Sequence, residues 1–531
     1  MVMRIGGLAS GMDIDSIVEK LMSARRVKVD KLYQQKQTIQ WQREAYRDIN
    51  TKMYDYRNNK LSTYRLEGTW LAKKAELSGN LTAISAKAGP SAMGQMKIKV
   101  DQLAKAATVQ SFEAVSVDSD FNPPKPNSDF DPTKTLADQI NAGNLADFTA
   151  TEFYVNGTKI EIDKNNDSLN DIIAKINRST NVSVYYDKNS GKLAFATKQT
   201  GLVNDPDNPD SGGGQYITFT NPDNPGVPNE FVENVLKIKD SSPKTAAQNA
   251  KVTVTINGLE TTQTSTSNTL TINGVELALK EAGGAETIIN VSTDVDAIVE
   301  KVKSFIADYN EMLKTLNDKV SEPRYRDFPP LTDAQKKEMK EDEIKIWEEK
   351  AKSGLLRNDE ILSKAVNNMR LMVYSPVETG NDKYRTLSSI GIETGPYTDN
   401  GKLYLVDEAK LRQAIQEDPE AIKNLFAGTG TDTENRSDVG IAKKLYADLQ
   451  TTMNDIIQKA GNPSVTDSTY RDESIIGEQL YLLGKRIDIE NERLQNLEAM
   501  YYRQFAAMEA AINRYNAQAM YIQNAFGGSG N

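Results

Sequence analysis

The chain has 531 residues, enough for roughly three to four domains, and a formal net charge of -10. An acidic chain lacks the basic surface that nucleic acids and anionic membranes require, and no stretch approaches eighteen consecutive apolar residues, so we predict neither nucleic-acid binding nor membrane insertion. Cys and His are absent, which excludes disulfides, thiolate nucleophiles, Ser-His-Asp triads and zinc sites built on these residues.

The first sixty-odd residues carry a helical pattern behind a glycine-rich start at 4–12. Asp13 has the character of an N-cap and is followed by apolar residues at helical spacing. The pattern thins over Arg25–Lys31. It resumes at every seventh position, with Leu32, Ile39, Tyr46 and Met53. We therefore predict one or two long helices with a narrow apolar stripe. The stripe either packs on one globular domain or pairs with another long helix, and its length favours the second alternative.

Two β-rich segments follow, the first split into 76–118 and 236–292 and the second at 119–235. Alternating and β-branched residues, punctuated by glycine and proline, predict strands in both. Ser168 is placed to cap a short helix in the second segment. Three Asn-Gly pairs follow strand-like runs and predict tight type I′ hairpins, at Asn156-Gly157, Asn257-Gly258 and Asn273-Gly274.

Helical periodicity returns at residue 293 with an apolar stripe that is broader than a coiled-coil seam, which predicts a globular helical domain. Thr332 and Gln335 form a capping-box pattern that opens a charged helix continuing through Trp347 and Ala351. Further N-caps are predicted at Asn358 or Asp359, at Asp407 and at Asp418-Pro419. Gly461–Thr469 is predicted to be a flexible joint before the last run.

The last run, Leu480–Phe526, repeats apolar residues mostly at steps of three and four, and no proline interrupts it. At 1.5 Å per residue it would be roughly 70 Å long, more than a globular domain needs. A four-four step at Leu497, Tyr501 and Phe505 predicts a stutter at which the helix could bend. Such a helix requires a long partner, in this chain or in another.

Together these patterns predict a multidomain α+β protein with long terminal coiled-coil helices, a discontinuous helical domain and inserted β-rich head domains. The predicted boundaries are 1–45 with 480–531 for the terminal legs, 46–75 with 293–479 for the helical domain, 76–118 with 236–292 for the first head domain, and 119–235 for the outer head domain.

No catalytic constellation emerges from the sequence. Residues 212–214 are a glycine run without the lysine and the following helix of a phosphate-binding loop. The acidic residues Asp205, Asp207 and Asp210 do not fit a calcium loop, because Pro209 occupies a ligand position. We therefore predict no enzymatic activity, no cofactor and no metal site.

Several segments resemble a known family. Ile5–Met22, which begins Ile-Gly-Gly-Leu-Ala-Ser-Gly-Met-Asp, is similar to the N-terminal signature of the bacterial flagellar filament cap proteins, also called hook-associated protein 2. The later half resembles the same family in four segments, Leu331–Gln335, Trp347–Leu356, Leu387–Ile392 and Gln504–Met508. The resemblance covers both ends and most of 246–531, and it is weakest over 119–235.

The resemblance implies a homo-oligomer, commonly a pentamer, at the distal tip of the flagellar filament. It implies that the cap shelters emerging flagellin, promotes its folding and polymerisation, and prevents its loss. Family members leave the cell by the flagellar type III route, which agrees with an N-terminus that shows no signal-peptide pattern. A cytoplasmic export chaperone typically binds the C-terminal region beforehand. The implied partners are therefore other copies of the chain, flagellin and this chaperone.

The terminal helices are expected to act as legs that contact neighbouring molecules through their apolar stripes. The residues expected to make these contacts are Ile14, Ile17, Val18, Leu21, Leu32, Ile39, Tyr46, Leu494, Leu497, Tyr501, Phe505, Met508, Ile512, Tyr515, Ile522 and Phe526.

Two alternatives remain open from the sequence. The protein could be another axial flagellar protein, such as a hook–filament junction protein, although the β-rich insertion between helical halves argues against this. It could instead be a surface adhesin that acts through the inserted β-rich domains, with 119–235 as the candidate binding unit.

Overall fold

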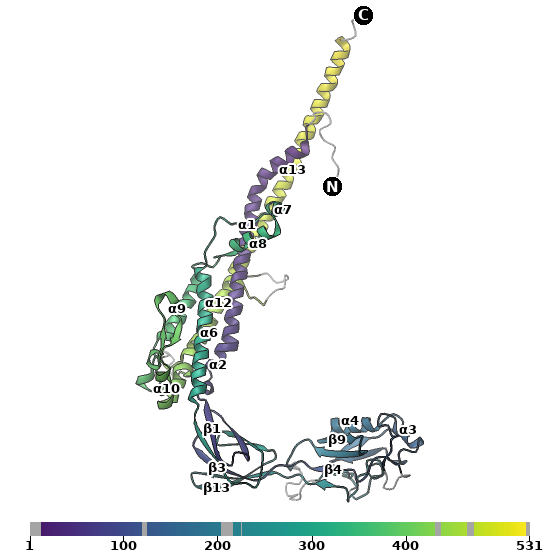
Figure 1. Cartoon of the computed structure of the whole chain (residues 1–531). Helices are drawn as coiled ribbons and strands as arrows, with labels where there is room; N and C mark the ends of the chain where they lie inside the picture. Colours follow the sequence, from purple (N-terminus) through teal and green to yellow (C-terminus); the bar gives the residue numbers. More distant parts are fainter. Residues whose placement is uncertain are drawn as a thin grey trace. The chain divides into compact units, whose positions relative to one another are not determined.

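Figure 1 shows the computed structural model of the chain, which describes residues 12–118, 125–202, 216–224, 226–430, 437–464 and 472–526. The chain forms two compact units. One combines the N-terminal residues up to Leu71 with Val295–Asn531, and the other is Ala72–Asp294. The first is largely helical and the second largely β-sheet, so the predicted α+β class with long terminal helices and inserted β-rich domains is confirmed.

The helical unit begins with α1 (Ile14–Asp55), a single helix of 42 residues. Asp13 caps it as predicted, since its carboxylate accepts a hydrogen bond of 3.0 Å from the Ser16 N–H. The thin part of the pattern at Arg25–Lys31 does not interrupt the helix, because Val29 there is buried against its neighbours. The predicted leg boundary at 45/46 therefore falls inside one continuous helix.

The remaining elements of this unit pack on α1 or on one another. Besides four short 3₁₀ turns (Glu67–Thr69, Asp382–Tyr384, Ser388–Ile390 and Tyr397–Asp399), they are a π-helical turn (Tyr56–Leu61), α2 (Ser62–Tyr64), α6 (Val295–Ser321), α7 (Asp333–Glu338), α8 (Glu341–Lys352), α9 (Glu360–Tyr374), β17 (Ile392–Thr394), β18 (Leu403–Leu405), α10 (Glu408–Glu417), α11 (Pro419–Ala427), α12 (Ile441–Ala460) and α13 (Ile475–Phe526). Trp70 anchors the core and stacks on Phe426 with ring centroids 4.1 Å apart.

The predicted caps of this unit are confirmed at Asp359, Asp407 and Asp418, whose side chains each accept a backbone N–H at the start of a helix. The prediction of one helix from Thr332 to Ala351 is wrong. The capping box of Thr332 opens only the short α7, and α8 starts anew because the Glu343 carboxylate accepts the Lys340 N–H at 3.1 Å.

The β-rich unit contains two apolar cores, and the first lies between a five-stranded and a three-stranded antiparallel sheet. The five strands lie in the order β1 (Lys73–Gly79), β16 (Thr287–Thr293), β3 (Gln95–Gln102), β12 (Ala250–Ile256) and β13 (Leu259–Ser265). The other sheet contains β14 (Thr269–Ile272), β15 (Val275–Leu279) and β2 (Ile84–Ala88). Alternate residues of β3 are buried, as a sheet with one face on a core requires.

The second core is covered by a four-stranded sheet of β11 (Lys244–Thr245), β4 (Thr108–Gln110), β10 (Lys192–Thr197) and β9 (Val182–Asp187). Four short elements complete it, namely α3 (Leu136–Asn141), α4 (Leu169–Ser179), α5 (Glu230–Asn234) and the hairpin of β7 (Glu152–Val155) with β8 (Thr158–Glu161). Val109 and Ile238 belong to this core although they lie outside 119–235. Val109 lies on β4, which pairs with β10 and β11, and Ile238 lies in the segment that leads into β11. Two further strands, β5 (Val117–Asp118) and β6 (Lys125–Pro126), pair with each other.

The three predicted Asn-Gly hairpins are confirmed, and each joins two antiparallel strands. Asn156, Asn257 and Asn273 have φ between 46° and 51°, and the glycine after each also has a positive φ. A type I′ turn needs this left-handed backbone at both central residues. Ser168 caps α4 through a capping box with Asp171, as predicted.

Candidate interaction surface of the terminal helices

The paired terminal helices α1 and α13 run antiparallel along each other. Two hydrogen bonds and one ion pair fix their register: Tyr502 to Asp15 at 3.0 Å, Asn491 to Tyr33 at 3.1 Å, and Lys28 to Glu490 at 2.5 Å. Residues near the start of α1 therefore lie beside residues near 502 of α13. Figure 1 shows α13 continuing beyond the point where α1 begins.

An apolar seam joins the two helices and contains many of the predicted leg residues. Near the start of α1, Ile14, Val18 and Met22 are buried, and the α13 residues packed against them are Leu494, Leu497, Tyr501, Tyr502 and Phe505. Further along, Leu32 is buried with Leu483 and Ile487, and Ile39 packs against this group. The narrow stripes that the sequence predicts on both helices thus meet each other within one chain.

Other predicted leg residues lie outside this seam. Tyr46 is buried beside the helical core, where its hydroxyl donates a hydrogen bond to the Asp359 carboxylate, and burial together with that carboxylate raises the pKa of the phenol. Ile17 is half-buried and Leu21 is 39 % exposed. Beyond the seam, Met508 and Ile512 are half-buried, whereas Tyr515 and Ile522 are mostly exposed. The Phe526 side chain lies outside the described side chains.

The base of the seam is held by charged groups that the sequence analysis did not identify. Asp472, just before α13, accepts hydrogen bonds from Arg47 at 3.1 Å and from Arg43 at 3.4 Å. Burial by itself would raise the pKa of Asp472. Hydrogen bonds from Ser474 and the charges of Arg47 and Arg43 outweigh burial and hold the pKa below its usual value. Arginines at i and i+4 of α1 are the only sequence signal for this contact, and they do not reveal its partner.

Chemistry-bearing clusters of other kinds are not found in the part of the chain that the structure describes. There, no three acidic side chains come together as metal ligands, and no helix has the length and apolarity to cross a membrane. Asp205, Asp207 and Asp210 lie outside the described residues.

The chain is similar to proteins of the bacterial flagellum. A family model described as flagellar hook-associated protein 2 C-terminus matches residues 247–517, and the model of the N-terminus matches 10–107. Flagellar hook-associated protein 2 of Halalkalibacterium halodurans is 33% identical over 99% of this chain and 100% of the relative. The protein of the same name from Thermotoga maritima is 28% identical over 71% of this chain and 55% of the relative.

Among solved structures, the D1-D2-D3 domains of the flagellar cap protein FliD from Escherichia coli match with a TM-score of 0.49 and 18% identity, over 76% of this chain and 96% of that chain.

The sequence matches define the class of protein, a structural component of the bacterial flagellum rather than a member of a known enzyme family. More narrowly, the chain belongs to the family of flagellar hook-associated protein 2, the flagellar cap proteins. The family favours neither the adhesin nor the junction protein that the sequence left open.

Proposed function

We propose that this protein caps the flagellar filament as a homo-oligomer, with five copies the expected number, at the distal tip. There it promotes the folding and polymerisation of exported flagellin and prevents flagellin from escaping. Membership of the hook-associated protein 2 family supports this proposal. The flagellar type III route is the proposed path of export.

The observation that carries the proposal is the C-terminal part of α13, where several large apolar side chains are exposed. Residues beyond Phe505 continue the helix past the seam with α1, and apolar side chains there remain 55–76 % exposed, at Tyr515, Met520, Tyr521 and Ile522. Burying a large apolar side chain is worth roughly 1.5–3 kcal/mol, so this end gains much by entering an apolar groove of another molecule. Most of the stability of a helix in a protein comes from packing of its apolar face, which also favours a partner for this stretch.

Within the predicted leg residues, the structure suggests a division of roles. The seam residues hold α1 and α13 together in one chain, and we propose that Met508, Ile512, Tyr515 and Ile522 contact flagellin, other copies of the cap, or the export chaperone. The chaperone contact precedes export and the other two follow it, so the same surface serves in succession.

Electron microscopy of filaments carrying an epitope-tagged full-length chain tests the proposal. A cap gives one label at the distal tip of each filament, whereas a junction protein labels the hook end and a flagellin labels the whole length. Cells lacking the protein should release unpolymerised flagellin into the medium. Label along the filament, or unchanged flagellin retention in the deleted strain, would refute capping.

A further inference from the structure

A second stripe runs along α13, on a face that α1 does not cover. Leu482, Arg486, Ile489 and Arg493 follow one another at steps of four, three and four, so they share one side of the helix. Leu482 is 56 % exposed and Ile489 is 65 % exposed, whereas Ile487, two residues from Ile489, is buried in the seam. Two residues are about 200° of helical rotation, and Leu482, Arg486 and Arg493 each lie about 100° from the seam residue that follows them, so the stripe lies on a flank of α13 outside the seam.

The two arginines of this stripe are exposed and form no ion pair with any residue in the described ranges. They lie near Glu490, whose carboxylate is held by Lys28 at 2.5 Å. That hydrogen bond lowers the pKa of Glu490 most, and the charges of Arg493 and Arg486 lower it further. Because Glu490 already has a partner, two positive charges remain available beside an exposed apolar row.

An exposed face of α8 carries two acids beside an isoleucine, together with Lys345, which lies three residues from Asp342 and four from Glu349. Asp342, Ile346 and Glu349 stand at steps of four and three, and all three are exposed, Ile346 by 57 %. The carboxylates of Asp342 and Glu349 form no ion pair within the part of the chain that the structure describes. The acids are seven residues apart, as are the arginines of α13, a spacing of about 10 Å on each helix.

This acidic face is held firmly in place from behind. The indole N–H of Trp347 donates a hydrogen bond of 2.7 Å to the Pro329 carbonyl, and its ring packs on Phe328 at 4.7 Å between centroids. Arg324 donates to the carbonyls of Ala351 and Ser353 at the end of the helix. A helix fixed in this way loses little backbone entropy when it binds.

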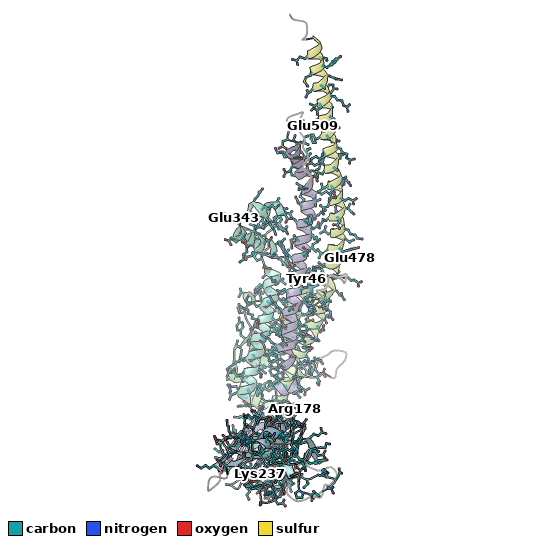
Figure 2. The ribbon with its side chains drawn as sticks, turned by 90° about the vertical axis from the view of Figure 1, so that its right-hand side faces the viewer. Tyr46, Arg178, Lys237, Glu343, Glu478 and Glu509 are labelled. Atoms are coloured by element: carbon teal, nitrogen blue, oxygen red, sulfur yellow. The ribbon has the colours of Figure 1, made fainter. Side chains whose placement is uncertain are left out.

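The helices that carry the two faces, α8 and the first part of α13, lie at a similar height on either side of α1 (Figure 2). The α8 segment rests on α1 at Gln34 and Trp41, where Gln34 donates to the Pro330 carbonyl at 2.8 Å and Lys352 lies over the Trp41 ring. In the register of the pair, that stretch of α1 lies beside the first part of α13. Figure 2 shows Glu343 of α8 on one side of α1 and Glu478 of α13 on the other.

We propose that the α8 face of one copy of this chain, defined by Asp342, Ile346 and Glu349, docks on the α13 stripe of the next copy. Two different surfaces on either side of α1 make a head-to-tail contact, which repeats from copy to copy and closes into a ring when the rotation permits. One chain cannot bring its own two faces together. The contact rests on the homo-oligomer of the proposed function and names the surfaces that build it. One helix face is smaller than the roughly 800 Å² that a stable interface buries on each partner, so it is one part of the ring interface.

Cysteine crosslinking of the full chain tests this contact, since the natural chain has no cysteine. A variant carrying both Ile346→Cys and Ile489→Cys is oxidised at concentrations where sedimentation shows assembly. We expect disulfide-linked multimers that end at the ring size, and no linkage in dilute monomer. The matched control pairs Ile346→Cys with Gln495→Cys, which is exposed on another side of α13, and should link at least tenfold less.

Charge reversal provides an independent readout. Arg486→Glu with Arg493→Glu should raise the concentration for half-assembly about tenfold, because two attractions become repulsions. Adding Asp342→Lys and Glu349→Lys to the same chain should restore assembly. If assemblies form without the disulfide between the two introduced cysteines and without rescue by the reversed acids, the proposed contact is refuted. The proposed cap function then stands, and the α13 stripe contacts another surface of the chain or another protein. If the natural chain does not self-associate at any concentration or at filament tips, the proposed oligomer itself fails.

Discussion

Two isoleucines, two residues apart on α13, have opposite environments. Ile487 is 2 % exposed and packs with Leu32 and Leu483, whereas Ile489 is 65 % exposed. Truncation of each to alanine removes the same atoms from the same helix. The pair therefore separates the seam that holds α1 to α13 from the stripe on the outer face.

The expected magnitudes follow from burial. Ile487→Ala removes about three buried carbons at roughly 0.8 kcal/mol each and leaves a cavity, so we expect a loss of about 2.5 kcal/mol in the local stability of the seam. Ile489→Ala removes only about a third as much buried apolar surface as Ile487→Ala. The higher helix propensity of alanine offsets roughly half of the stability lost with that smaller surface. The effect of Ile489→Ala on the monomer should stay within about 0.5 kcal/mol.

Hydrogen exchange of the full chain, diluted to monomer, measures both effects locally. A loss of about 2.5 kcal/mol speeds exchange in peptides around Leu32 and Leu483 by roughly fifty- to a hundredfold. A global melt is less suitable, since a chain with two compact units need not unfold in one step. Equal acceleration by both variants, or none by Ile487→Ala, would refute the assignment of the two faces.

Three further predictions test other parts of the helical unit. Burial raises the pKa of Asp448, so its charged form destabilises the fold at neutral pH, and this destabilisation disappears as pH falls through that pKa. Asp448→Asn should therefore raise the melting temperature by about 1–2 °C at pH 7, with a smaller increase at acidic pH. The pKa of Asp472 is lowered, so its carboxylate contributes to stability above the usual pKa near 3.8, and this contribution is lost on further acidification. Asp472→Asn should reduce local stability by roughly 1 kcal/mol at pH 7, measured by hydrogen exchange at the start of α13, and by less at low pH. Ile512→Asp should shift the melting temperature by less than about 1 °C, because Ile512 lies beyond the seam, but should increase flagellin released into the medium; normal retention would contradict its proposed role at the tip.

Local chemistry made much of the fold predictable from the sequence. An Asn-Gly pair fits a turn with two positive φ angles, and Asp or Thr before a helix supplies the acceptor that the first N–H groups lack, so these features need no knowledge of distant residues. The apolar stripes of α1 and α13 were visible for a similar reason, because their spacing is a property of each helix alone.

Features set by distant contacts were not predictable in the same way. The break between α7 and α8 has no Gly or Pro to mark it, and α8 is oriented by Trp347 reaching a loop eighteen residues earlier in the chain. The second β core recruits β4 and β11 through strand pairing that no local pattern specifies. Likewise, the predicted start of α13 at Leu480 is five residues late, because Ile475 and Ile476 join the helix where Asp472 is fixed by Arg47 of α1.

The outer stripe of α13 escaped the sequence search because its apolar positions alternate with arginines. A pattern with one continuous apolar face predicts a single partner for such a helix, although different faces of a long helix can contact two partners. The environments of Ile487 and Ile489 separate these roles. A residue that is buried within the chain constrains folding, and an exposed residue beside charges that form no ion pair within the described residues constrains association. Substitutions along α13 should therefore fall into two classes, those that speed exchange in the monomer and those that change only assembly, and neighbouring residues should often belong to different classes.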